Sequence, residues 1–162
     1  MNKKETVKIE LLSPNHVIEL KDKGFIDMYE FLFMLQVYSN MVQSVNEHNR
    51  NPETLYELHW VVRDIKTDNI GGMIGLSEIN HKDKRAALRT ADVQRSKIIT
   101  KACTFIENYC IDNLKLNSVY GHADRDATIA FWKKFGYTTK TASKDVKGAF
   151  LFEKIFGGKQ YS

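Results

Sequence analysis

The sequence predicts an α+β fold (mixed α/β) with a central, mainly antiparallel sheet flanked by helices. Short segments alternate apolar and polar residues, which is typical of strands, and longer segments repeat apolar residues every three or four positions, which is typical of helices. Three strand-like segments follow one another across short polar turns, and such turns join antiparallel neighbours. The 162 residues suit one domain, expected at 1–156, with a flexible C-terminal tail at 157–162.

The first third of the chain predicts one strand and one long helix. Alternation over Thr6–Leu12 predicts the strand, and Ser13-Pro14 ends it. Phe25–His48 predicts the helix, whose apolar stripe is rich in aromatic residues and methionine. We favour packing of this stripe in the core over a role as a pocket wall or a dimer face. A polar connection is expected at 47–54.

The middle of the chain predicts three successive strands. Leu58–Ile65 and Ile70–Ile79 form a hairpin, and Arg85–Val93 follows after a second polar turn. We expect a bulge or a close approach of the backbone at the glycines of the second strand, which are Gly71, Gly72 and Gly75.

The last third predicts two helices that alternate with strands. The first helix covers Ser96–Leu114, and a strand follows at Leu116–His122. The second helix, Asp126–Phe135, begins at an N-cap aspartate, ends at a glycine and turns directly into an aromatic-led strand. Ala149–Ile155 is the closing strand.

Composition and charge narrow the class of protein. Hydrophobic residues make up 43% and charged residues 27%, and no apolar run approaches the roughly 20 residues that cross a bilayer. We therefore expect a cytoplasmic protein without a membrane partner. The net charge of +4 is mild, and the lysines and arginines are spread along the chain, so the pattern does not favour nucleic acid as the partner.

The cysteines and histidines predict neither a disulfide nor a metal site. Cys103 and Cys110 lie seven residues apart in one predicted helix, about 10 Å along its axis, which is too far for a disulfide. We expect both to be reduced and buried. The five histidines are scattered and show none of the spacings of metal ligands.

Three local sequences, taken with the order of the predicted elements, resemble the GNAT superfamily of acetyl-CoA-dependent N-acetyltransferases. Asn69–Arg89 is similar to a hairpin of the ribosomal-protein alanine and amino-sugar acetyltransferases. Ala102–Val119 resembles the family's helix, its short connection and the strand after it. Ile129–Tyr137 resembles the closing helix and its glycine turn. The resemblance covers roughly residues 58–155 and implies the GNAT fold.

The resemblance also implies a cofactor site for acetyl-CoA. In the family, the pyrophosphate sits at a helix N-terminus, after a loop of the pattern Q/R-x-x-G-x-G/A. That loop corresponds here to Gln94–Ile99, where Lys97 and Ile99 replace the small residues. These side chains block the cradle, or basic residues grip the phosphates directly, or the segment is an ordinary capped helix start. The implied cofactor-binding residues are Val93, Gln94, Arg95, Ser96, Lys97, Ile98, Ile99 and Asp126.

The family's usual acid and base residues are replaced in this chain. Ala87 stands where many members have a glutamate, and Trp132 stands where many have a tyrosine. The family's helix-opening asparagine is matched by Arg125 or Asp126. Asp92 and His122 are the candidate catalytic residues, while Glu78 is a weaker substitute base and two phenols, Tyr109 and Tyr120, stay unassigned.

Two functions follow from this pattern. The resemblance implies an N-acetyltransferase that moves acetyl from acetyl-CoA to a primary amine, on a protein N-terminus, a lysine or an amino sugar. Because several expected functional residues are replaced together, the alternative is a catalytically inactive GNAT-fold protein that binds a protein partner as an inhibitor or adaptor. Homodimer formation is compatible with either function.

Overall fold

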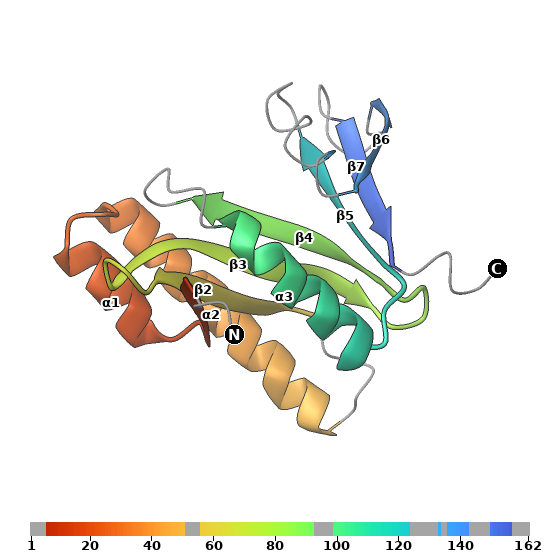
Figure 1. Cartoon of the computed structure of the whole chain (residues 1–162). Coiled ribbons are helices and arrows are strands. Elements are labelled where there is room, and N and C mark those ends of the chain that lie inside the picture. Colours follow the sequence, from red (N-terminus) through yellow and green to blue (C-terminus); the bar gives the residue numbers. More distant parts are fainter. Residues whose placement is uncertain are drawn as a thin grey trace, which may run out of the picture. The chain divides into compact units, whose positions relative to one another are not determined.

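A computed structural model describes residues 6–50, 56–92, 99–123, 133, 136–142 and 150–156 (Figure 1). In chain order the described elements are β1 (Val7–Leu11), α1 (Pro14–Asp22), α2 (Met28–Arg50), β2 (Leu58–Asp64), β3 (Asn69–Asn80), β4 (Arg85–Asp92), α3 (Ile99–Asp112), β5 (Ser118–Ala123), β6 (Thr138–Ala142) and β7 (Phe150–Ile155). The strands hydrogen-bond in the order β1-β2-β3-β4-β5-β7-β6.

The predicted fold class is confirmed. β1–β2, β2–β3, β5–β7 and β6–β7 are antiparallel pairs, whereas β4 and β5 run parallel. The predicted strand ranges agree with the observed ones to within two residues. The chain contacts divide the molecule into two compact units, Met1–Ser77 with Arg89–Ile106 (unit 1) and Glu78–Leu88 with Glu107–Ser162 (unit 2). That the chain forms a single domain stays a prediction.

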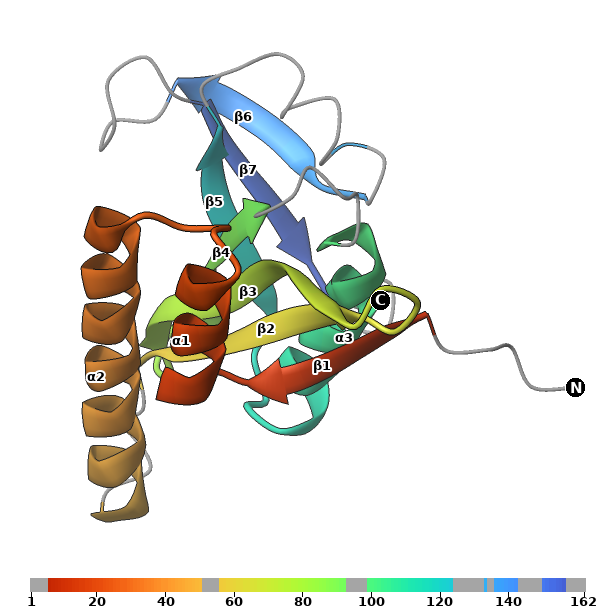
Figure 2. The ribbon, with the colours of Figure 1, turned by 90° about the vertical axis from the view of Figure 1, so that its left-hand side faces the viewer.

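Unit 1 consists of strands covered by helices on both faces. α1 and α2 lie against one face of β1, β2 and β3, and the first half of α3 lies against the other (Figure 2). Because helices cover both faces, the side chains of β2 are buried on both faces over Leu58–Val62. On the α3 side, the rings of Trp60 and Phe105 pack edge to face with centroids 5.6 Å apart.

α1 is a helix that the sequence analysis missed. Pro14 was interpreted only as the end of the first strand, but it occupies the first turn of α1, where a missing N–H costs nothing. The backbone N–H of Ser13 donates to Nδ1 of His16 at 3.0 Å, which satisfies a group at the helix start. Gly24, with φ of 75°, follows the end of the helix.

The apolar stripe of α2 is only partly buried, so the expectation that it packs in the core was wrong in part. Met34 and Met41 are buried. The expected core residues Met28 and Leu32 are instead 54% and 58% exposed. The period of a helix shows which residues share a face, but it does not show how much of that face another element covers. α2 also continues to Arg50, into the predicted connection.

The predicted irregularity in β3 is confirmed. Val62 pairs with Gly72, but the next residue, Arg63, pairs with Ile70. Gly71 is therefore the extra residue of a bulge, which a glycine accommodates readily.

Arg63 ties β2 to α1. Its guanidinium donates two hydrogen bonds to the Glu19 carboxylate, at 2.8 and 2.9 Å, and a third to Glu10 at 3.0 Å. The hydrogen bonds from Arg63 are the largest cause that lowers the pKa of Glu19 to about 2. The pair therefore fixes α1 on the strands through a charge-assisted contact.

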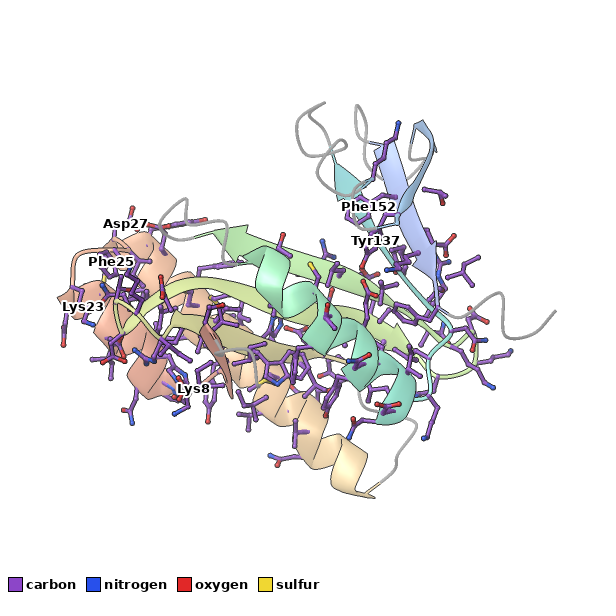
Figure 3. The ribbon with its side chains drawn as sticks, in the orientation of Figure 1. Lys8, Lys23, Phe25, Asp27, Tyr137 and Phe152 are labelled. Carbon is purple, nitrogen blue, oxygen red and sulfur yellow. The ribbon has the colours of Figure 1, made fainter. Side chains whose placement is uncertain are left out.

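Unit 2 contains β5, β7 and β6, with the beginning of β4 paired to β5. Tyr137 and Phe152 pack edge to face with ring centroids 5.5 Å apart. Both residues are labelled in Figure 3. Gly136 has φ of 86°, and its N–H donates to the carbonyl of Lys133, which confirms the predicted glycine turn. The rest of the predicted helix 126–135, except Lys133, lies outside the described residues.

Both cysteines are buried and free, as predicted. Burial is the main cause that raises the pKa of Cys110 to about 12, which makes this thiol unreactive. None of the helices that the structure describes has the length and apolar character needed to cross a membrane.

Candidate functional site

Most of the predicted cofactor residues lie outside the described part of the chain. These are Val93, Gln94, Arg95, Ser96, Lys97, Ile98 and Asp126. Ile99 is the first residue of α3, so the last residue of the predicted phosphate-binding segment belongs to a helix. The cofactor assignment stays a prediction.

The two predicted catalytic residues lie on strands. Asp92 is the last residue of β4, and His122 lies in β5, opposite Leu151 of β7. The structure describes their backbone but not their side chains, so their catalytic role stays a prediction.

The weaker candidates have other environments. Glu78 is exposed and has φ of 50° within β3. Ala87, at the position of the family's glutamate, is buried. The ring of Tyr120 lies 4.0 Å from the guanidinium of Arg85, a cation–π contact. Burial, with Cys110 nearby, raises the pKa of Tyr109, which makes this phenol a weaker acid.

Unit 1 contains a cavity of about 550 Å³ that the sequence analysis did not predict. It lies along α2, β2, β3 and the end of β4, and we call it the α2–β3 cavity. Its volume suits a small organic molecule. The apolar wall consists of Phe33, Met34, Val37, Met73 and Ile74, and the charged or polar groups are Glu30, Gln36, Asn40, Glu57, His59, Ser77, Arg89 and Thr90.

A mostly buried histidine–glutamate pair belongs to this lining. Nε2 of His59 and Oε2 of Glu57 are 2.7 Å apart, and the two side chains are only 10% and 17% exposed. A carboxylate can only accept a hydrogen bond, so we place the imidazole N–H on Nε2. The other ring nitrogen, Nδ1, is then a proton acceptor, and it has no hydrogen-bond partner within the described ranges.

The backbone around this pair is held by α2. Oγ of Ser44, which is fully buried, accepts hydrogen bonds from the backbone N–H groups of Tyr56 and Glu57, at 2.7 and 3.0 Å. The backbone N–H of His59 donates to Sδ of Met41 at 3.2 Å. Three contacts from α2 therefore set the position of the pair.

Gly75 leaves the space that the imidazole occupies. It pairs directly with His59 across β2 and β3, and a Cβ atom at Gly75 would overlap Nδ1 of the ring. Only a residue without a side chain permits this position of His59. The backbone at Gly75 is thus closely approached, and the group that approaches it is the side chain of His59.

The surroundings favour a neutral imidazole. Burial lowers the pKa of His59, while the hydrogen bond and the charge of Glu57 act in the opposite direction and Arg89 adds a smaller lowering effect. Arg89 also donates from Nε to Oγ of Ser77 at 2.8 Å. The pair thus combines a neutral proton acceptor with a neighbouring carboxylate, an arrangement that suits proton transfer.

The spacing of Glu57 and His59 in the sequence could have indicated this site. Glu57 and His59 are two residues apart at the start of a strand, so their side chains project to the same side. A histidine within the apolar run LHWVV also needs a polar partner if it is buried. What the sequence could not show is that Gly75 and Arg89 lie beside the pair.

Among the residues that the structure describes, no three histidine, cysteine or acidic side chains cluster in a way that could hold a metal ion.

No family model matches the chain, and the search of curated proteins found no match. Solved structures do match it. A candidate ribosomal-protein-serine acetyltransferase from Vibrio cholerae is similar at 15% identity and a TM-score of 0.70, with 94% of this chain and 95% of that chain covered. A mutant form of the SpeG spermidine N-acetyltransferase from Vibrio cholerae is similar at 16% identity and a TM-score of 0.63, with 93% and 94% covered.

A third match is a dodecameric spermidine N-acetyltransferase from the same organism, at 17% identity and a TM-score of 0.63, with 93% of this chain and 94% of that chain covered. At these identities the similarity shows the fold, and the fold is the one found in these acetyltransferases. The similarity runs over nearly the whole of both chains, so it includes the N-terminal part, which the sequence resemblance over roughly residues 58–155 does not cover.

Proposed function

We propose that this protein transfers acetyl from acetyl-CoA to a primary amine. The observation that carries the proposal is the α2–β3 cavity, which combines a buried Glu57–His59 pair with an apolar wall on an acetyltransferase fold. Acetyl transfer requires a cavity that takes up an ammonium group and a nearby group that accepts its proton. This cavity supplies carboxylates and an imidazole for these two tasks.

Acetyl-CoA would supply the activated acetyl thioester. The residues that would hold it are Gln94–Lys97, because they offer two cations and a hydroxyl directly before α3 begins at Ile99. The N-terminus of a helix favours phosphate oxygens through its free N–H groups and its positive end. Thr90, four residues before Gln94, lines the α2–β3 cavity, so β4 leads from the acceptor site to the proposed cofactor segment.

The acceptor classes are a protein N-terminus, a lysine side chain or an amino sugar. Glu30 and Glu57 favour a cationic amine electrostatically. The apolar wall of α2 and β3 favours an acceptor with an apolar part.

Isothermal titration with acetyl-CoA tests whether the protein binds the cofactor. Release of the coenzyme A thiol in the presence of amines tests whether it transfers the acetyl group. We expect acetyl-CoA to bind and Lys97→Ala to weaken the binding several-fold, because a phosphate contact would be lost. Lys66→Ala is a matched control, since Lys66 is an exposed lysine in the turn between β2 and β3. Absence of binding at millimolar acetyl-CoA would contradict the proposal, and tighter binding by the Lys97 variant would indicate that Lys97 blocks the cradle.

The second candidate is an inactive GNAT-fold protein that acts as an inhibitor or adaptor. The observation that favours it is the exposure of four large apolar residues at the start of α2, which are Met28, Tyr29, Leu32 and Phe33. Acetyl-CoA binding with turnover of an amine would argue against this candidate. Capture of one stoichiometric protein partner that is lost in a Tyr29→Ser, Leu32→Ser variant, together with no acetyl-CoA binding, would favour it.

A further inference from the structure

We propose that the exposed side of α2 is the docking surface for a second copy of this chain, packed helix against helix. We call this side the α2 face, and its exposed residues are Met28, Tyr29, Leu32, Phe33, Gln36, Ser39 and Gln43. The proposal goes beyond acetyl transfer and does not rest on it, because it depends only on the surface of α2. It also gives one occupant to the apolar residues whose exposure favours the adaptor function.

The first half of the α2 face is apolar and open to solvent. Four large side chains are exposed there, namely Met28 at 54%, Tyr29 at 79%, Leu32 at 58% and Phe33 at 62%. Tyr29, Leu32 and Phe33 are three and four residues apart, so they lie on one side of the helix and form a continuous patch. Apolar patches of this kind on a protein surface mark interaction sites.

Charged side chains are almost missing from this stretch of helix. Over residues 28–46, whose side chains the structure describes, Glu30 is the single charged residue. Charged residues make up 27% of the whole chain, and 27% of nineteen residues would be about five. The core of a protein–protein interface is depleted in charge and enriched in aromatic residues and methionine. A helix that lies on a membrane surface is instead rich in lysine and arginine, so the composition favours a protein partner.

The second half of the α2 face is complementary to itself. Gln36, Ser39 and Gln43 are exposed along it. Amide and hydroxyl groups both donate and accept hydrogen bonds, so two copies of this face can meet without burying an unpaired charge. A twofold contact brings the same patch of both copies together, and it places the two helices antiparallel when the axis crosses them. Their dipoles then oppose each other, which is the favourable arrangement.

The area of the α2 face fits a stable dimer. An aromatic side chain can bury about 150–250 Å², so Tyr29 and Phe33 together leave about 200–350 Å² open at their exposures. Met28 and Leu32 bring the apolar part to about 400–600 Å² on each copy. A specific interface buries about 800 Å² on each partner. α2 has 23 residues and is about 34 Å long, so the polar half of the face can supply the rest.

The α2 face borders the α2–β3 cavity. Glu30, Phe33 and Gln36 line the cavity and are exposed at the same time. A second copy on the face therefore lies beside the edge of the cavity that α2 forms. Leu32 belongs to the face but not to the lining, so a substitution there tests the contact without changing the cavity wall.

The first test measures the mass of the full chain by sedimentation equilibrium at micromolar concentrations. We expect the wild type to have twice the 18.7 kDa of one chain. Leu32→Glu should weaken the dimer at least 100-fold, because a twofold contact brings the two added carboxylates together. Leu32→Ser should weaken it about tenfold through lost apolar contact alone. Circular dichroism checks that both variants are folded.

The matched control is Ile111→Glu, since Ile111 is 41% exposed on α3. It adds the same charge at another exposed apolar residue and should leave the dimer unchanged. A wild type that stays monomeric at every concentration would overturn the inference, also if it then binds a different protein or lipid vesicles through α2. A dimer of Leu32→Glu that is as tight as the wild type would overturn it as well.

The second test locates the contact with a bifunctional maleimide. Both native cysteines are buried, so the reagent reports an introduced thiol. We expect Leu32→Cys to form a covalent dimer at least ten times faster than Ile111→Cys, because only the first thiol faces its counterpart. Equal rates for the two variants would overturn the inference that the copies meet at the α2 face.

Discussion

The imidazole of His59 lies over Gly75, its direct partner across β2 and β3, in space that any other residue at position 75 would fill. Glu57 holds the same ring from the other side through Nε2. The position of the histidine in the α2–β3 cavity thus depends on one residue that binds it and on one that has no side chain.

Gly75→Ala should displace the ring of His59. Because the added methyl group overlaps a buried side chain, we expect a loss of about 1–3 kcal/mol in the free energy of unfolding, the usual cost of overpacking. Urea denaturation of the wild type, both single variants and the Gly75→Ala, His59→Ala double variant measures it. In the His59→Ala background the methyl group should cost little, so additive effects would contradict the proposed overlap.

Ser44→Ala should disturb the Glu57–His59 pair from a distance. The change removes the acceptor of the backbone N–H groups of Tyr56 and Glu57, and loss of a buried acceptor costs about 1–3 kcal/mol. Thermal or urea unfolding measures the loss, and the imidazole signals of His59 report the displacement. Ser44→Thr keeps the hydroxyl and is the matched control. Unchanged His59 signals in Ser44→Ala would show that the serine does not position the pair.

The stability of the protein should fall as the pH decreases through the range in which histidine titrates. Burial lowers the pKa of His59 in the folded state below the ordinary value of 6.5, so below that pH the unfolded state binds the extra proton more readily. His59 therefore stabilises the fold above about pH 6.5 and loses this contribution as the pH falls through its folded-state pKa. Urea denaturation between pH 8 and 5 should show a shallower decline for His59→Gln than for wild type. Parallel curves for the two proteins would exclude the effect.

Glu19 should contribute to stability in more acidic solution. Its pKa is lowered from 4.5 to about 2, chiefly by the hydrogen bonds from Arg63, so its contribution is complete above pH 4.5 and is lost as the pH falls towards 2. The carboxylate is partly exposed, and after allowance for solvent screening we expect about 1 kcal/mol at neutral pH. Glu19→Gln should lose this amount at pH 7 and much less at pH 2, where Glu19 is about half protonated in the folded state. The exposed Asp22→Asn is the control. An equal loss for Glu19→Gln at both pH values would show that the contribution is not electrostatic.

Much of the fold could be predicted because it depends on local patterns. Alternation marked β1, β2 and β3, and the glycine turn at Gly136 and the bulge at Gly71 followed from the backbone freedom of glycine. α1 was missed because Pro14 ends a strand and begins a helix at the same point, and the sequence shows both signals as one break.

The candidate site was less accessible to sequence reasoning. The predicted catalytic residues Asp92 and His122, and the cofactor residues between β4 and α3, followed the family pattern, and the structure describes the side chain of none of them. The cavity depends on residues far apart in the chain, Glu30, His59 and Arg89, whose meeting no local spacing indicates.

The sequence by itself determined most of the elements, their order and the mixed, mainly antiparallel class, because hydrophobic period, turns and glycines act over a few residues. Only the tertiary structure decided which part of the α2 stripe is exposed, which histidine lies in a cavity and which glycine makes room for it. Those outcomes follow from the register of β2 against β3 and from the packing of α2 on them, and both are set by contacts between segments that are distant in the chain.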